Sequence, residues 1–138
     1  TEWDAKGLST TVDWDSTVED FKNLKGYEVI IISGHGDYRK YYNDGTPLVT
    51  SSLLLCEQST ELMDVIYSAD LKQFRVGKYI MSKAKTTYSI LPAFFEHYYN
   101  SGDLDGSFVF MENCETHGQD GHVKMNMANA LLVPPQMQ

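Results

Sequence analysis

The chain has 138 residues, of which 42% are hydrophobic and 12% aromatic, and this is enough for one domain with a buried core. Its 11 basic and 19 acidic residues give a formal net charge of -8, which argues against a nucleic acid as partner because phosphate binding needs clustered Lys and Arg. No apolar run reaches the roughly 20 residues of a membrane helix, so we expect a soluble chain without a membrane span.

The amino-terminal half predicts a lead-in, a helix, a strand and a hairpin. Residues 1–14 have no regular pattern. The segment Ser16-Thr17-Val18-Glu19 matches a capping box, and helical spacing of apolar residues follows it, so we expect a helix over residues 16–24. Residues 27–33 are rich in β-branched side chains and lack polar alternation, which is typical of a strand buried on both faces of a parallel sheet. The turn sequence Asn43-Asp44-Gly45 between strand-forming runs then predicts a hairpin.

The second half predicts a β insertion followed by a helix, a strand and a helix. Residues 63–89 contain three runs of strand-forming residues, at 65–67, 74–81 and 86–90, and we expect them to be an insertion outside the core. Pro92 suits the first turn of a helix with an aromatic face. An apolar strand follows at residues 107–111, and residues 125–132 have the pattern of a final helix.

This order of elements predicts an α/β fold with a largely parallel sheet and flanking helices, formed as a single domain over residues 1–138. Two core strands are too few for such a sheet. We therefore expect an incomplete domain, in which a second chain or a further segment completes the sheet.

Each of the two core strands is followed by a chemically competent side chain. His35 comes between two glycines after the strand at 27–33, and Cys114 comes after the strand at 107–111. Open α/β sheets place active sites past the carboxyl ends of their strands, so neighbouring strands would bring the two residues together. An imidazole can take the proton of a thiol and make it a nucleophile. The backbone amides of Gly36 and Cys114 would then stabilise the oxyanion of an acyl transfer.

The same segments resemble two motifs of the caspase-like cysteine peptidases, a family that includes clostripain, gingipain, legumain and the caspases. Residues 31–36, Ile-Ile-Ser-Gly-His-Gly, look like the family's strand that ends in His-Gly. Residues 110–118, Phe-Met-Glu-Asn-Cys-Glu-Thr-His-Gly, look like the strand that leads to its Cys. The resemblance covers roughly residues 16–133 and implies the caspase-like fold. By it, His35 is the general base and Cys114 the nucleophile of an endopeptidase that cuts a protein or peptide substrate.

Glu112 lies two residues before the cysteine, where it is positioned to line the pocket for the residue that precedes the cleaved bond. A buried carboxylate there favours Lys or Arg, because an unpaired buried charge costs roughly several kcal/mol. Legumain-like enzymes have a similarly placed Glu and prefer Asn. We therefore expect cleavage after Lys or Arg, with Asn or Asp as the second choice. The alternative for Glu112 is an ordinary strand-end charge that faces water.

A zinc site is a competing hypothesis. Cys114, His117 and His122 have the spacing Cys-x2-His-x4-His within one loop, and Asp37 or Asp120 would add an oxygen ligand that zinc accepts. The segment lacks the paired Cys-x2-Cys of a strong zinc motif, and the favoured alternative is that His117 and His122 are ordinary loop residues. The peptidase hypothesis implies no cofactor.

A non-catalytic binding module with the same fold is the third hypothesis. Tyr38, Tyr41 and Tyr42 in the hairpin would then be exposed and support recognition of a partner, although packing on the surface of the sheet is the favoured role for them. Cys56 has no role in any of the three hypotheses and is expected to be a buried thiol. The richness in Tyr, Asn, Ser and Thr favours a secreted or cell-surface bacterial protein, but the sequence does not assign a compartment.

Overall fold

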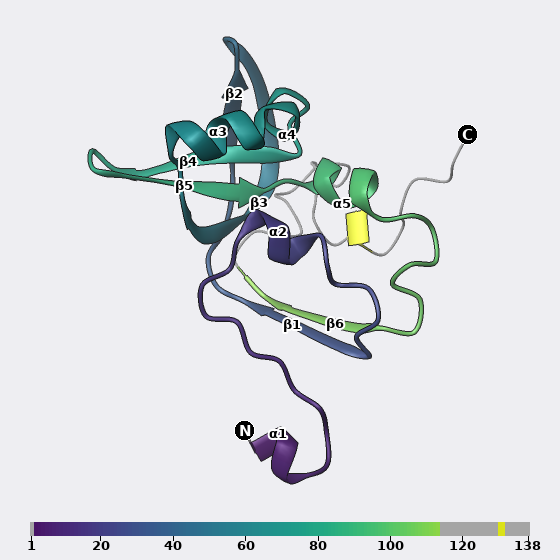
Figure 1. Ribbon diagram of the computed structural model, residues 1–138. Coiled ribbons are helices and arrows are strands. Elements are labelled where there is room, and N and C mark those ends of the chain that lie inside the picture. Colours follow the sequence, from purple (N-terminus) through teal and green to yellow (C-terminus); the bar gives the residue numbers. More distant parts are fainter. Residues whose placement is uncertain (1, 114–129, 132–138) are drawn as a thin grey trace.

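The computed structural model of the chain describes residues 2–113 and 130–131 (Figure 1). Its helices are short, and most of the regular structure is β-sheet. The elements in chain order are α1 (Glu2–Ala5), α2 (Val18–Phe21), β1 (Val29–Ser33), β2 (Gly36–Asn43), β3 (Thr46–Gln58), α3 (Glu61–Ile66), α4 (Ser68–Lys72), β4 (Val76–Ser82), β5 (Lys85–Ile90), α5 (Pro92–Tyr98) and β6 (Phe108–Glu112). None of the helices in these ranges is long and apolar enough to cross a membrane.

The strands form two separate sheets, so the prediction of a largely parallel, caspase-like sheet is wrong. β1 and β6 pair in parallel as a two-stranded sheet, whereas the other strands form an antiparallel sheet in the order β2-β3-β5-β4. In Figure 1 the small sheet lies on one side of α2 and the antiparallel sheet on the other. Two-residue connections join β2 to β3 and β4 to β5, and such short connections permit only antiparallel pairing. These strands therefore pair with one another and do not extend the β1–β6 sheet.

The predicted hairpin after residue 35 is confirmed. Its turn residues Asp44 and Gly45 have φ angles of 47° and 78°, and positive φ at both central positions is the type I′ geometry that Asp-Gly favours. β3 continues well beyond this hairpin. Its first part pairs with β2 and its second part with β5, so β3 connects the hairpin to the rest of the antiparallel sheet.

Residues 63–89 are part of the core, and the prediction of an insertion outside it is wrong. β4 and β5 confirm the two later strands of this segment, but residues 65–67, predicted as a strand, end helix α3. The Thr60 hydroxyl accepts a hydrogen bond from the amide of Met63 at 3.1 Å, and this N-cap starts the helix. The segment contributes three side chains to the core cluster, Tyr67, Val76 and Tyr88.

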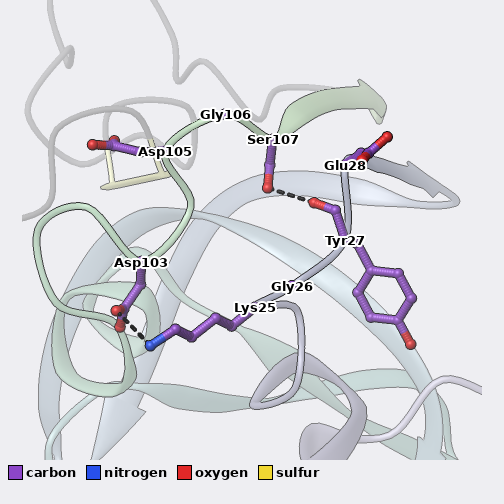
Figure 2. A pocket seen from close by; sticks show the side chains of 8 residues that line it. All are labelled: Lys25, Gly26, Tyr27, Glu28, Asp103, Asp105, Gly106 and Ser107. Carbon is purple, nitrogen blue, oxygen red and sulfur yellow. Dashed lines mark hydrogen bonds and ion pairs between the residues drawn. The ribbon is translucent and has the colours of Figure 1, made fainter.

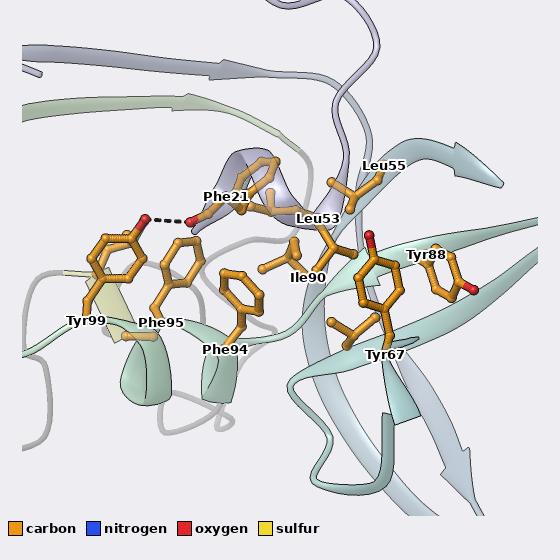
Figure 3. Close-up of a cluster of buried hydrophobic side chains, with 13 residues drawn as sticks. Phe21, Leu53, Leu55, Tyr67, Tyr88, Ile90, Phe94, Phe95 and Tyr99 are labelled. Atoms are coloured by element: carbon orange, nitrogen blue, oxygen red, sulfur yellow. Dashed lines mark hydrogen bonds between the residues drawn. The ribbon is translucent and has the colours of Figure 1, made fainter. Parts of the chain in front are cut away.

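The core lies between the antiparallel sheet, α2 and α5 (Figure 3). As predicted, α5 begins at Pro92, and its apolar face inserts two buried phenylalanines. The rings of Phe94 and Phe95 are 5.7 Å apart at 84°, an edge-to-face arrangement that adds to the gain from burial. The Tyr99 hydroxyl donates to the carbonyl of Phe21 at 2.5 Å and so ties the end of α5 to α2.

The two predicted helices near the chain ends have different outcomes. α2 is shorter than the predicted range 16–24, and its N-cap is Thr17, whose capping box is completed by Asp20. The predicted helix over residues 125–132 lies mostly outside the described residues. Its two described residues, Ala130 and Leu131, are helical and buried in the core cluster.

The β1–β6 sheet confirms the positions of the two predicted core strands but not their burial. Three side chains of its inner face, Ile32, Val109 and Met111, pack against the core cluster. The side chains between them point the other way and are exposed, among them Ile31 and Phe110. The prediction of a strand buried on both faces is therefore wrong, because in the described residues no helix covers the outer face.

Candidate active site

The strands that lead to His35 and Cys114 are hydrogen-bonded neighbours. β1 and β6 pair in register up to Ser33 and Glu112. One residue further, the amide of Gly34 still donates to the carbonyl of Glu112 at 3.4 Å. Because parallel neighbours end at the same edge of a sheet, the two segments that follow β1 and β6 leave the sheet side by side.

Asn113 continues this arrangement by one position. Its side-chain nitrogen lies 3.9 Å from the point where a Cβ on Gly34 would stand, so the amide covers the glycine. Its Oδ1 is buried and has no hydrogen-bond partner in the described part of the chain. Cys114, the next residue, lies outside the described residues. Its contact with His35, and the contribution of its amide to an oxyanion site, stay predictions.

His35 occupies the bend between β1 and β2. Its carbonyl accepts a hydrogen bond from the amide of Leu54 at 2.9 Å, which anchors the main chain to β3. Its side chain is exposed, and no hydrogen bond to the imidazole is formed by the residues that the structure describes. None of the described residues therefore competes for the ring nitrogens.

The amide of Gly36 has no partner in β3. Residues of an antiparallel pair alternate between positions that exchange hydrogen bonds and positions that do not. His35 and Leu54 are at a bonded position, so the next pair, Gly36 and Leu53, is a non-bonded one. The Gly36 N–H consequently points away from β3, towards the free edge of β2, and no Cβ obstructs its approach to a ligand.

Glu112, the predicted pocket residue, is exposed rather than buried. The hydroxyl of Ser33 donates to its carboxylate at 3.2 Å across the strand pair. The exposure agrees with the alternative of a strand-end charge that faces water. A substrate cation at this carboxylate would gain only the modest attraction of a solvated pair, unless the substrate itself excludes water.

A cluster beside the site was not predicted from the sequence. The Asp37 carboxylate accepts hydrogen bonds from the Tyr38 amide at 2.8 Å and from the Tyr79 hydroxyl at 3.1 Å. The guanidinium of Arg39 stacks on the Tyr79 ring at 4.3 Å. Burial, and then the hydrogen bond to Asp37, raise the pKa of Tyr79. The alternation of Asp37 and Arg39 along β2 is the only sequence signal for this cluster, because Tyr79 comes from β4.

The zinc hypothesis falls mostly on residues whose structure is not described. Cys114, His117, Asp120 and His122 all lie outside the described residues. Asp37 is described, and both of its carboxylate oxygens already accept hydrogen bonds within the antiparallel sheet. Within residues 2–113 and 130–131, no group of three or more metal-binding side chains occurs.

The tyrosines of the binding-module hypothesis do not form one exposed set. Tyr42 is exposed, but Tyr41 is buried against Gly77, where a Cβ would overlap its ring. The Tyr41 hydroxyl also donates to Ser52 at 2.6 Å. The prediction of an exposed Tyr41 is therefore wrong, because the antiparallel sheet curls and brings β2 towards β4.

Cys56 is exposed, so the prediction of a buried thiol is wrong as well. It lies near the end of β3, where its sulfur is 3.6 Å from the carbonyl of Trp14. The apolar residues Leu53 and Leu55 precede it, and the alternation of the strand turns the next side chain outwards.

No protein-family model, curated protein or solved structure matches this chain. The resemblance to the caspase-like peptidases therefore rests on sequence motifs alone.

Proposed function

We propose that the chain is a cysteine endopeptidase in which His35 is the general base and Cys114 the nucleophile. The observation that carries the proposal is the parallel pairing of β1 with β6 in a register that joins Ser33 to Glu112. His35 and Cys114 each follow this pair by two residues. Neighbouring strands lie roughly 4.8 Å apart, a separation from which a thiol and an imidazole come within hydrogen-bond reach.

The reaction follows from these two groups and the Gly36 amide. His35 takes the thiol proton, and the thiolate attacks the carbonyl carbon of the peptide bond. The Gly36 N–H stabilises the resulting oxyanion, and protonated His35 then gives its proton to the departing amine. A water molecule, activated by neutral His35, hydrolyses the thioester and releases the acid and the free thiol.

Glu112 is the residue that would set the substrate preference of the peptidase. It is the charged side chain on the strand end next to the bend that holds His35. A carboxylate attracts a Lys or Arg side chain that precedes the cleaved bond, and an Asn or Asp side chain is the second choice. We expect Glu112→Gln to remove the preference for Lys and Arg without abolishing the chemistry.

The test is an intact-mass measurement after incubation with peptidyl ketones that carry Arg, Lys, Asn or Asp next to a thiol-reactive group. The wild type is compared with Cys114→Ala and His35→Ala. Cys56→Ala is the matched control, because Cys56 is an exposed thiol outside the site. We expect one adduct, on Cys114, that depends on His35 and persists in Cys56→Ala.

Three outcomes contradict the proposal. Labelling that moves to Cys56, or that does not depend on His35, would show an ordinary thiol. A folded wild type that forms no adduct with any of the four ketones would show that the dyad does not operate. A bound zinc in the native mass that disappears in His117→Ala would favour the metal site.

A further inference from the structure

The outer face of the β1–β6 sheet is an apolar surface without a partner among the described residues. We define this outer face by Val29, Ile31, Phe108 and Phe110, which are 57%, 60%, 64% and 50% exposed. The register pairs Val29 with Phe108 and Ile31 with Phe110, so the four side chains are contiguous. In Figure 1, α2 and α5 lie on the other side of these two strands.

Such a face is unusual for a parallel pair, because parallel strands are nearly always covered on both sides. Four large side chains at about half exposure present on the order of 400 Å² of apolar surface, a size that often marks an interaction site. A stable dimer buries about 800 Å² on each partner, roughly twice this amount. The outer face therefore suits one element of secondary structure better than a whole globular surface.

Carboxylates lie at both ends of the outer face. Glu112 is exposed at the carboxyl end, and Glu28 and Asp105 are exposed at the amino end. Figure 2 shows the amino end, where Lys25 contacts Asp103 at 3.1 Å and so has a partner already. No ion pair to Glu28, Asp105 or Glu112 is formed within the described ranges. An apolar strip between acidic ends is complementary to an apolar element with basic ends.

We propose that the outer face binds a cationic amphipathic helix of a second polypeptide. A helix is about 10 Å wide and covers two strands that are roughly 4.8 Å apart. Its apolar stripe would bury the four side chains, and its Lys or Arg residues would meet Glu112 at one end and Glu28 and Asp105 at the other. The proposal does not depend on peptidase activity.

Two other occupants are less complementary. A second copy of the chain has a net charge of -8 and repels the first. The amino-terminal arm of the chain exposes Leu8, Val12 and Trp14, which are apolar enough to fold back. However, residues 1–15 contain four acidic residues and one Lys, so the arm brings negative charge to acidic ends.

The test uses a fluorescein-labelled helix of Leu and Lys, with leucines at helical spacing, and measures anisotropy. The outer-face variant Ile31→Thr with Phe110→Thr is compared with Val65→Thr with Ile80→Thr, whose residues are 71% and 70% exposed elsewhere. We expect the outer-face variant to lose at least about tenfold in affinity and the control variant to match the wild type. A helix with Glu in place of Lys should bind at least about tenfold more weakly.

A second variant tests the proposed helix binding if the outer-face variant does not fold. Glu28→Gln with Glu112→Gln keeps the apolar face and should weaken the Leu and Lys helix several-fold, with a smaller dependence on salt. Equal binding by all variants, or equal binding of a scrambled peptide, overturns the proposal. A wild-type dimer in sedimentation that is lost in the outer-face variant overturns the proposal in favour of a second copy of the chain. Much tighter binding after removal of residues 1–15 overturns it in favour of the amino-terminal arm.

Discussion

The two sheets of the molecule differ in how completely they are covered. The antiparallel sheet packs one face on the core cluster, and buried hydroxyl residues lie along its central strands β3 and β5. The buried hydroxyl residues are Thr50, Ser51, Ser52, Thr87 and Ser89. The β1–β6 sheet has two strands, from opposite ends of the described chain, and one exposed face. The comparison indicates that stability resides in the antiparallel sheet, whereas the proposed chemistry resides at the end of the small one.

Polar networks reinforce the larger sheet and its helices. Glu57 of β3 accepts hydrogen bonds from the Tyr67 hydroxyl and from the amide of Val18, which links the sheet to α3 and α2. Asp70 of α4 accepts from Arg75 at 2.6 Å and from the Tyr98 hydroxyl at 2.8 Å. Between β1 and β6, the side-chain hydrogen bond is the exposed one from Ser33 to Glu112. Substitutions in the antiparallel sheet and its helices should therefore lower the free energy of unfolding, whereas substitutions at the end of the β1–β6 sheet should lower reactivity.

The largest expected effect is a loss of reactivity without a loss of stability. His35→Ala should slow ketone labelling of Cys114 by about a thousandfold or more, because the thiol loses its base. The free energy of unfolding should change by less than about 0.5 kcal/mol, because the side chain is exposed. His97→Ala, at an exposed histidine of α5, is the control and should label at the wild-type rate. A strongly destabilised His35→Ala would contradict the assignment of stability to the antiparallel sheet and of chemistry to the end of the small sheet.

The second prediction compares phenylalanines of the two regions. Phe94→Ala should lower the free energy of unfolding by about 3–5 kcal/mol, because the side chain is fully buried between α5 and the antiparallel sheet. Phe110→Ala should cost less than about 1 kcal/mol, because half of that side chain is exposed. Urea unfolding of both variants measures the difference. Similar losses would mean that the small sheet contributes as much as the large one.

The third prediction compares the ion pairs of the two regions. The pair between Arg75 and Asp70 has side chains only 14% and 6% exposed, whereas Lys25 is 69% exposed in its pair with Asp103. Asp70→Asn should cost about 3 kcal/mol, because it leaves a buried guanidinium without its counter-charge. Asp103→Asn should lower the free energy of unfolding much less, because water screens the pair. Equal costs in urea unfolding would contradict this assignment.

Local signals in the sequence were sufficient for several elements of the fold. The Asp44-Gly45 turn, Pro92 at the start of α5 and the apolar runs of β1 and β6 each act within a few residues, and the structure has all of them. The sheet arrangement was not predictable in this way. The second part of β3 pairs with β5, roughly 30 residues later in the chain, and no local pattern encodes that choice.

The site was predictable only where local signals in the sequence define it. The ends of β1 and β6 follow from hydrophobic runs, and the structure pairs them in register. The exposure of Glu112 depends on which face of the small sheet is covered, and composition does not reveal this. The contact of Asp37 with Tyr79 joins residues 42 positions apart across a curled sheet, so it needs the tertiary structure.

The smallest expected effect concerns alkaline pH and belongs to the antiparallel sheet. The Tyr88 hydroxyl donates to Asp64 at 2.6 Å. Burial, and then this hydrogen bond, raise the pKa of Tyr88 from 10.0 to about 12. Because the folded-state pKa is the higher one, the stabilisation is complete below pH 10 and is lost as the pH rises towards about 12. The wild type should therefore exceed Tyr88→Phe by about 1 kcal/mol near neutral pH, and this difference should shrink across that interval.

Urea unfolding of both proteins across the alkaline range measures the difference. Tyr67, whose pKa is also raised, first by burial and then by its bond to Glu57, is present in both proteins, so the comparison reports on the Tyr88 hydroxyl and on its coupling to Tyr67. A difference between the wild type and Tyr88→Phe that stays constant with pH would mean that the Tyr88 hydroxyl is solvated in the folded protein. The β3–β5–β4 layer would then be less completely closed than its contacts with α3 indicate.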